Sequence, residues 1–212
     1  MSSKSAAKTI KRKPVTVKNI LSSGSNLEDR LIPDMKELEG VVSDLKRMGY
    51  KIVLTQGVYD MLHEGHARYL EKALSYGDLL IVGVDSDELT SARKGPTRPI
   101  VPQSERLQML AHLRSVSILT VRELEHGMEK LIRTVKPDVL ITSASTKDFS
   151  KKEMMEYKNC CGEIVVLPPQ AATSTTARVR LLTISGADQL AKEISAGVPQ
   201  LVENALRKFR SQ

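Results

Sequence analysis

Short apolar runs alternate with helical patterns along most of this chain. Five runs are continuous enough to be buried strands: Ile52–Thr55, Leu79–Val84, Ser117–Val121, Val139–Thr142 and Ile164–Leu167. The segments between them repeat their apolar residues at helical spacing: Ala67–Tyr76, Gln103–Leu113, Glu125–Val135 and Lys151–Asn159. Because parallel strands need helical crossovers, this alternation predicts an α/β fold with a doubly wound, parallel, five-stranded sheet that binds ligands at its carboxyl edge.

Two further helical segments flank this alternation. Asp34 is a suitable N-cap for a helix that ends near Gly49. After the last strand, apolar residues recur from Leu182 to Phe209, with a break at Pro199. These residues need an apolar surface to cover, either in the same domain or in a second subunit.

The positive charge is concentrated at the N-terminus. The formal net charge is +7, and residues 1–18 contain six lysines and arginines and no acid, so removing those six leaves +1 for the rest. Such a segment can contact nucleic acid or an acidic surface, and it faintly resembles an organellar transit peptide. We favour the interpretation that this segment is a disordered tail, and we therefore do not expect nucleic-acid binding. With a linker at Ser22–Asn26, the predicted organisation is a tail at 1–30, a central domain at 31–184 and a helical extension at 185–212.

The composition is that of a globular protein. The chain has 212 residues, of which 41% are hydrophobic and 27% charged, and no apolar run is long enough to cross a bilayer. The N-terminus lacks the apolar stretch of a secretion signal. The two cysteines, Cys160 and Cys161, are adjacent, which suits neither a disulfide nor a zinc site. We therefore expect a reduced, cytoplasmic protein with no membrane partner.

The most informative motif is His63-Glu64-Gly65-His66, between the first predicted strand and the helix that follows it. A strand, a glycine-containing turn and a helix start together form a phosphate site, because N–H groups at a helix N-terminus attract anions. Imidazoles at that place donate hydrogen bonds to phosphate oxygens without a permanent charge. Two satisfied surface histidines are the alternative, and the strand–turn–helix context makes it the weaker one.

Three further segments carry chemistry that suits a polyphosphate. Lys94–Pro99 follows the second strand as a loop with cations, Pro102–Arg106 opens a helix with Arg106 near its start, and Thr173–Thr176 opens a late helix with hydroxyl groups. Each segment is a weak signal alone, because a Lys-Gly pair is common and a Ser-Thr-Thr run is most often an ordinary N-cap.

Taken in order, these motifs resemble the cytidylyltransferase-like nucleotidyltransferases, and most closely the adenylyltransferase part of ADP-heptose synthases. The resemblance spans 53–182 and rests on the following segments: Gly57–His66, Gly77-Asp78, Asp85-Ser86-Asp87, Lys94-Gly95 with Arg98-Pro99, Glu105-Arg106 and Ser174-Thr175-Thr176. It implies a Rossmann-like nucleotidyltransferase fold. It also implies that a substrate phosphate attacks the α-phosphorus of a nucleoside triphosphate and that pyrophosphate leaves.

The resemblance also implies roles for individual residues. His63, His66 and Lys94 would be catalytic, the histidines holding the triphosphate and Lys94 neutralising charge at the α-phosphate or at the incoming phosphate. The implied nucleotide-binding residues are Gly57, Val58, Tyr59, Gly65, Arg106, Ser174, Thr175 and Thr176. Of these, Arg106 binds phosphate or braces the site, and Tyr59 stacks on a base or fills its turn. Mg²⁺ would bridge phosphate oxygens with few or no protein ligands, so no metal-binding residue is predicted.

The acceptor pocket is the least defined part of the site. Asp87, Thr142 and Ser143 are candidates for substrate binding, although Asp87 is equally suited to capping the next helix and Asp60 to binding backbone N–H groups. Where ADP-heptose synthases carry Lys-Gly-Gly-Asp-Tyr, this chain has Thr142–Thr146. Its Gln170-Ala171-Ala172 lacks the arginine and glycine that glycerol-3-phosphate cytidylyltransferases place before Ile-Ser-Thr-Thr, which favours ATP over CTP.

The leading hypothesis is therefore adenylyl transfer from ATP to a small phosphorylated molecule such as heptose 1-phosphate. CTP-dependent transfer to a polyol phosphate such as glycerol 3-phosphate and adenylyl transfer to FMN are the related alternatives. A nucleotide-binding regulator without turnover is the alternative that is not an enzyme. The extension at 185–212 predicts a homodimer, with folding back onto the same chain as the alternative.

Overall fold

The structure, a computed structural model, describes residues 15–22, 26–127, 129–144, 156–170, 182–190, 192–195 and 198. Its core is a five-stranded sheet of β1 (Ile52–Gly57), β2 (Leu79–Asp85), β3 (Ile118–Arg122), β4 (Val139–Ser143) and β5 (Glu163–Leu167). The order is β3-β2-β1-β4-β5, and every neighbouring pair is parallel. The predicted doubly wound, parallel sheet is confirmed, and each predicted strand lies within two residues of an observed one.

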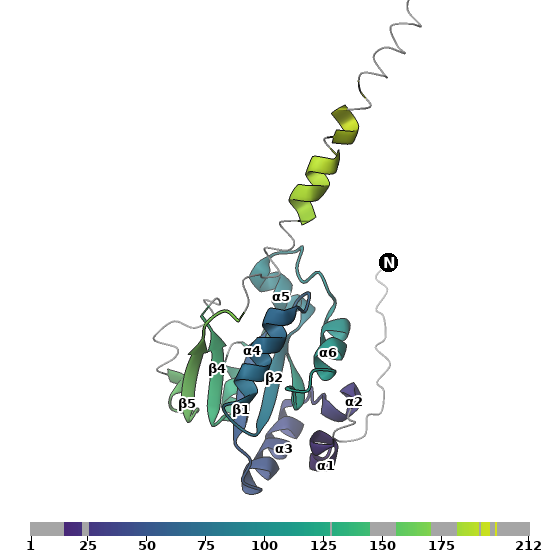
Figure 1. The fold of residues 1–212 in the computed structure, drawn as a ribbon. Helices are drawn as coiled ribbons and strands as arrows, with labels where there is room; N and C mark the ends of the chain where they lie inside the picture. Colours follow the sequence, from purple (N-terminus) through teal and green to yellow (C-terminus); the bar gives the residue numbers. More distant parts are fainter. Residues whose placement is uncertain are drawn as a thin grey trace, which may run out of the picture. The chain divides into compact units, whose positions relative to one another are not determined.

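Helices cover both faces of the sheet (Figure 1). Alternate strand residues face opposite layers, so Ile52 and Leu54 pack with α1 (Val17–Leu21), α3 (Met35–Arg47) and α7 (Lys130–Val135). Val53 faces the other layer, which is built from α4 (Glu64–Leu74) and α6 (Gln103–Ala111). The order of the strands reverses between β1 and β4. In such sheets the crevice for a ligand lies outside the carboxyl ends of the strands at that reversal.

The predicted helix after Asp34 is confirmed as α3. The Asp34 carboxylate accepts a hydrogen bond from the backbone N–H of Glu37 at 2.7 Å, as an N-cap does. Leu38, Val42 and Leu45 form its buried stripe. The helix is followed by Gly49 at a φ of +89°, a left-handed conformation in which glycine carries no steric penalty.

The prediction of a tail over residues 1–30 is wrong for the part from Val15 onward. Val15 and Ile20 are buried in the core beside α3, and Asn26 caps the short helix α2 (Leu27–Arg30). The Arg30 guanidinium donates to the carbonyls of Ala111 and Val116 at 3.0 and 2.9 Å, which ties this segment to the end of α6. Residues 15–30 contain two basic and two acidic residues, so the concentrated positive charge lies mainly before this part.

One helix was not predicted from the sequence, and one predicted helix is divided in the structure. Residues 87–94 form α5 (Asp87–Lys94), whose burial is limited to Leu89 and Thr90, so its sequence shows no apolar stripe. Lys94 therefore ends a helix instead of beginning a loop. The helix predicted over Glu125–Val135 is divided into the 3₁₀ turn η1 (Leu124–His126) and α7, with Gly127 at a φ of +59° between them.

The chain divides into two compact units, Met1–Ala171 and Ala172–Gln212, so the boundary lies before the one predicted at 184. In the second unit, residues 182–190 are helical. Of the helix predicted over Lys151–Asn159, residues 151–155 lie outside the described part of the chain. Among the described helices, none is long and apolar enough to span a membrane.

Candidate active site

The turn between β1 and α4 forms one wall of the candidate site. Two residues in it, Tyr59 and Met61, have φ values of +54° and +47°, which are rare for residues other than glycine. Tyr59 is buried, its phenol bonds Thr55, and burial raises the pKa of that phenol well above its ordinary value. Its ring meets the His66 ring edge-on, with the centroids 5.7 Å apart. Tyr59 therefore fills the turn and supports His66.

His63 is the N-cap of α4. Its Nδ1 accepts a hydrogen bond from the backbone N–H of Gly65 at 3.1 Å. A neutral imidazole that accepts at Nδ1 carries its proton on Nε2, so Nε2–H is the donor of His63. Gly65 is buried in the first turn of α4, and its N–H is used in holding the histidine.

His66 stacks on His63, with ring centroids 4.0 Å apart and planes inclined at 25°. Burial lowers the pKa of His66 to about 4, and the neighbouring His63 and Lys94 add to the decrease. The ring is therefore neutral near pH 7. Its Nδ1 is buried and has no hydrogen-bond partner within the described residues. A neutral, half-buried imidazole with an unsatisfied buried nitrogen beside a helix N-terminus is suited to an anionic ligand.

Lys94 lies at the end of α5, close enough to His66 to influence its pKa. The segment that follows is held against the β1–α4 turn by Asp60. The Asp60 carboxylate accepts from the backbone N–H groups of Ile100 and Val101 at 3.0 and 2.9 Å and pairs with Arg98 at 2.9 Å. Asp60 thus binds backbone N–H groups, as its type suggested, but those of a distant loop.

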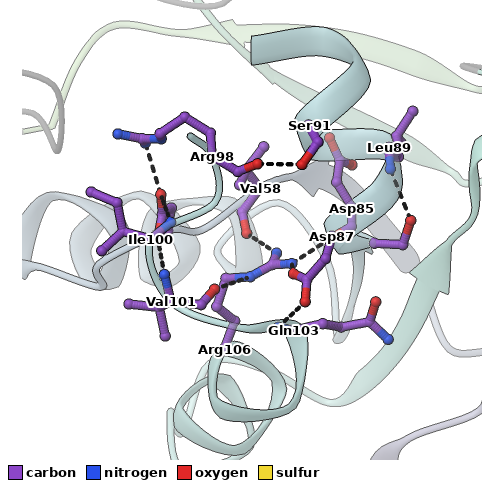
Figure 2. A network of polar contacts seen from close by, with 12 residues as sticks. Val58, Asp85, Asp87, Leu89, Ser91, Arg98, Ile100, Val101, Gln103 and Arg106 are labelled. Carbon is purple, nitrogen blue, oxygen red and sulfur yellow. Dashed lines mark hydrogen bonds and ion pairs between the residues drawn. The ribbon is translucent and has the colours of Figure 1, made fainter. Parts of the chain in front are cut away.

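Arg106 lies inside the protein, and its side chain is not exposed. Figure 2 shows the polar contacts around it. Its guanidinium donates to the carbonyls of Val58, Asp85 and Val101 at 2.5, 2.8 and 3.0 Å. It also donates to the Asp87 carboxylate at 2.7 Å. These contacts support the bracing role of Arg106, because a phosphate would have to displace buried protein partners.

Asp87 is occupied by the same network. Besides Arg106, its carboxylate accepts from the backbone N–H of Gln103 at the start of α6, at 3.1 Å. The cap of its own helix is Ser86, whose hydroxyl accepts from the N–H of Leu89. The capping role considered for Asp87 therefore applies to α6. Its role as a substrate-binding residue stays a prediction.

A second ionic cluster lies at the ends of β2 and β3, and the sequence analysis missed it. Asp85 and Arg122 are paired in register, are fully buried and approach to 2.5 Å, and Arg93 of α5 meets the same carboxylate at 2.6 Å. Asp85 ends β2 and Arg122 ends β3. If β2 and β3 had been taken as neighbouring strands, these positions would have indicated the ion pair.

The other predicted residues are placed as follows. Gly57 ends β1 and Val58 is buried just after it. Thr142 is buried in β4, and Ser143 ends that strand beside the reversal of strand order. Ser174, Thr175 and Thr176 lie outside the described residues. Within the described ranges, no group of three His, Cys, Asp or Glu side chains is arranged to hold a metal ion.

Comparison with known proteins identifies relatives of this arrangement. A family described as Cytidylyltransferase-like matches residues 54–186. The Bifunctional protein HldE of a Nitratiruptor species is 39% identical over 151 residues, which cover 71% of this chain and 32% of that protein. The Bifunctional protein HldE of a Helicobacter pylori strain is 42% identical over 123 residues, covering 58% of this chain and 26% of that protein. The chain thus spans about a third or less of these curated relatives.

Solved structures show the same similarity. A lipopolysaccharide core biosynthesis protein from Thermoplasma volcanium is 30% identical, with a TM-score of 0.50, over 57% of this chain and 98% of that one. Pantothenate synthetase from Thermus thermophilus is 13% identical, with a TM-score of 0.51, over 66% of this chain and 61% of that one. The second similarity concerns the fold alone.

Proposed function

The chain belongs to the cytidylyltransferase-like family and is a nucleotidyltransferase, and we propose that it transfers an adenylyl group from ATP to a small phosphorylated sugar. In the proposed reaction, a phosphate oxygen of the sugar attacks the α-phosphorus of ATP. The bond from that phosphorus to the bridging oxygen breaks, and pyrophosphate leaves with the electron pair. A sugar 1-phosphate such as heptose 1-phosphate is the proposed acceptor.

The observation that carries this proposal is the state of His66. It is neutral near pH 7, half-buried with its Nδ1 atom inaccessible, stacked on His63 and within electrostatic reach of Lys94. The developing negative charge on the leaving pyrophosphate would meet hydrogen-bond donors already in position at the start of α4. Lys94 would neutralise charge at the α-phosphate or at the attacking phosphate. Such a reaction needs positioning and charge stabilisation, and no protein nucleophile.

Mg²⁺ is part of the proposal as an ion carried by the triphosphate. The described residues provide no cluster of three ligand side chains, so a cage built by these residues does not fit, whereas an ion held by phosphate oxygens and water does. When bound, the ion would neutralise part of the charge on the triphosphate. Every contact proposed above for the histidines and Lys94 is with phosphate oxygens.

The choice of ATP and of a sugar phosphate is supported by two similarities. The sequence motifs resemble those of the adenylyltransferase part of ADP-heptose synthases. A similar solved structure is that of a lipopolysaccharide core biosynthesis protein, and a lipopolysaccharide core contains sugars.

We test the choice of ATP and of a sugar phosphate by measuring pyrophosphate release with ATP or CTP against a panel of sugar phosphates, glycerol 3-phosphate and FMN. Release with a sugar phosphate and ATP supports it. Release with CTP or another acceptor alone would replace it, and binding of nucleotide without release would favour a regulator.

The role of His66 has its own test. We expect His66→Ala to lower kcat by about 10²-fold, which is typical for the loss of one preorganised donor. His112→Ala, at an exposed position after α6, is the control and should turn over normally. Near-normal turnover by a folded His66→Ala enzyme would contradict the assignment. Binding of a triphosphate next to His66 should also raise the pKa of this imidazole, which NMR titration measures directly.

Lys94→Ala distinguishes two roles for the lysine. If Lys94 acts at the α-phosphorus, kcat and kcat/KM should fall together, because the contact strengthens in the transition state. A change confined to KM for ATP would place Lys94 on ordinary triphosphate binding.

The proposal includes a homodimer formed through the second unit. Leu182, Leu190 and Ile194 in this unit are 65, 58 and 55% exposed, more apolar surface than a solvated helix normally carries. Light scattering of a variant with both Leu190→Asp and Ile194→Asp should give monomers where the wild type gives dimers. A wild type that is monomeric at tens of micromolar would exclude this dimer.

A further inference from the structure

Lys94 belongs to the segment that connects β2 with α6. This segment comprises α5 and the loop from Gly95 to Val101. The Arg106 guanidinium contacts this segment at both ends, through the Asp87 carboxylate and the Val101 carbonyl. Lys94 lies between these two points. One buried side chain therefore fixes both ends of the segment on which Lys94 is carried.

The same guanidinium reaches the wall that carries the histidines. It donates to the carbonyl of Val58, which lies in the turn that leads from β1 to His63 (Figure 2). Asp60 makes a second link between the same two parts, by accepting from Ile100 and Val101 and by pairing with Arg98. The histidine wall and the Lys94 segment are thus joined by two side chains of opposite charge.

We propose that Arg106 is a positioning residue for the nucleotidyl transfer, which sets Lys94 against the His63–His66 pair by holding Val58, Asp87 and Val101 together. The inference rests on the proposed function, and it adds a residue that acts without touching the substrate. The planar guanidinium has N–H donors in a fixed fork and reaches acceptors in several directions at once. A lysine ammonium at this place cannot reach all of them. A misplacement of about 1 Å at a reacting group can lower the rate by about 10²-fold.

The chain offers a matched control for this role. Arg30 also donates to backbone carbonyls, those of Ala111, Leu113 and Val116, but at the opposite end of α6. Arg30→Lys and Arg106→Lys each remove a guanidinium that binds several carbonyls, so both should lower the thermal midpoint. Arg106→Lys alone should lower kcat, by about 10-fold to 10²-fold, with KM for ATP changed less than about 3-fold.

A measurement without substrate separates this inference from the proposed function. Burial lowers the pKa of His66 most, and His63 and then Lys94 add to the decrease, so a Lys94 segment released from Arg106 should let that pKa rise by the part that Lys94 contributes. NMR titration of His66 should show this rise in Arg106→Lys and not in Arg30→Lys. An unchanged His66 pKa in Arg106→Lys would overturn the inference, even if the wild type releases pyrophosphate from ATP. A shifted pKa in a protein without turnover would instead count against the proposed function.

If Arg106→Lys fails to fold, Asp87→Asn provides a variant that keeps the Arg106 guanidinium and the shape of the side chain at position 87. Arg106 and Gln103 donate to different oxygens of the Asp87 carboxylate, so the single amide oxygen can accept from one of them, while the second acceptor and the ion pair are lost. We expect kcat to fall several-fold, KM for both substrates to stay unchanged, and the pKa of His66 to rise. A rise in KM for the acceptor alone would place Asp87 on the substrate, and a rise in KM for ATP alone in Arg106→Lys would place Arg106 on the nucleotide. Either result would overturn positioning through this network.

Discussion

The two ends of the sheet use the same residue type in different ways. At the amino ends of the strands, Asp78 and Asp138 each accept one backbone N–H from the start of β1, that of Lys51 and that of Ile52, both at 2.7 Å. At the carboxyl ends, Asp60 and Asp85 pair with arginines in buried surroundings. Aspartate at the amino end thus completes the backbone hydrogen bonding of the sheet.

The carboxyl end, in contrast, holds loops together by ionic side chains. At this end the parallel strands continue into loops of different length, and no regular backbone hydrogen bonding holds such loops in place. The arginine–aspartate network supplies the fixed geometry there, and it adjoins the histidines and Lys94. From this comparison we expect changes at the amino end to affect stability alone, and changes at the carboxyl end to affect stability and activity together.

The largest effect is expected at the carboxyl end. Asp85→Asn removes the charge that Arg93 and Arg122 share in a fully buried place, so we expect the free energy of unfolding to fall by about 3–5 kcal/mol. Urea unfolding measures the change. Asp44→Asn, which breaks an exposed pair with Arg47, is the control and should change it by less than about 1 kcal/mol. Equal effects of the two variants would show that the buried network adds no stability.

At the amino end the sensitive feature is a close backbone approach. A Cβ on Gly77 would lie 2.7 Å from the carbonyl oxygen of Lys51, so Gly77→Ala should destabilise the fold by about 1–3 kcal/mol. Gly40→Ala is the opposite case, because Gly40 lies in α3 with nothing within 4 Å of its added Cβ. It should stabilise the fold by about 0.5–1 kcal/mol. Neither variant should change kcat. A loss of turnover in a folded Gly77→Ala enzyme would remove the distinction between the two ends.

A smaller effect is expected where an aspartate serves a single N–H group. Asp138→Ala leaves the backbone N–H of Ile52 without its carboxylate acceptor, and we expect a loss of about 1 kcal/mol. Hydrogen exchange of the Ile52 amide should become faster while KM for ATP stays constant. An exchange rate equal to that of the wild type would mean that water replaces the carboxylate without cost.

The smallest effect concerns pH at the carboxyl end. The pKa of folded His66 is lowered to about 4, so between that value and about 6.5 the unfolded chain binds the proton that the folded protein excludes. Stability from this group is complete above about pH 6.5 and decreases as the pH falls toward about 4. At about pH 6 the loss should be less than about 1 kcal/mol. The thermal midpoint of His66→Gln should fall less between pH 7 and pH 6 than that of the wild type. Parallel curves for the two proteins would contradict the burial of a neutral imidazole.

Much of the fold was predictable because local pattern and burial agree. Each apolar run that we predicted as a strand is one, and the Asp34 cap and Gly49 mark α3 correctly. The helix α5 escaped prediction because a surface helix with two buried residues has no apolar stripe. The segment from Val15 to Leu31 escaped because its helices α1 and α2 have only five and four residues, too few to show an apolar period.

In the candidate site, too, the features set by local sequence were predictable and those set by tertiary contacts were not. The sequence alone determined that His63, Gly65 and His66 begin a helix after a buried strand, since residues four apart or less are placed by local geometry. Only the tertiary structure decided that the Arg106 guanidinium binds protein carbonyls, because its acceptors belong to three segments that the sheet brings together. The neutral state of His66 also depends on burial and on Lys94, which lies 28 positions further along the chain. Charge and hydrogen bonding act through space. The contacts of Arg106 and the protonation state of His66 therefore could not be determined before the strand order was known.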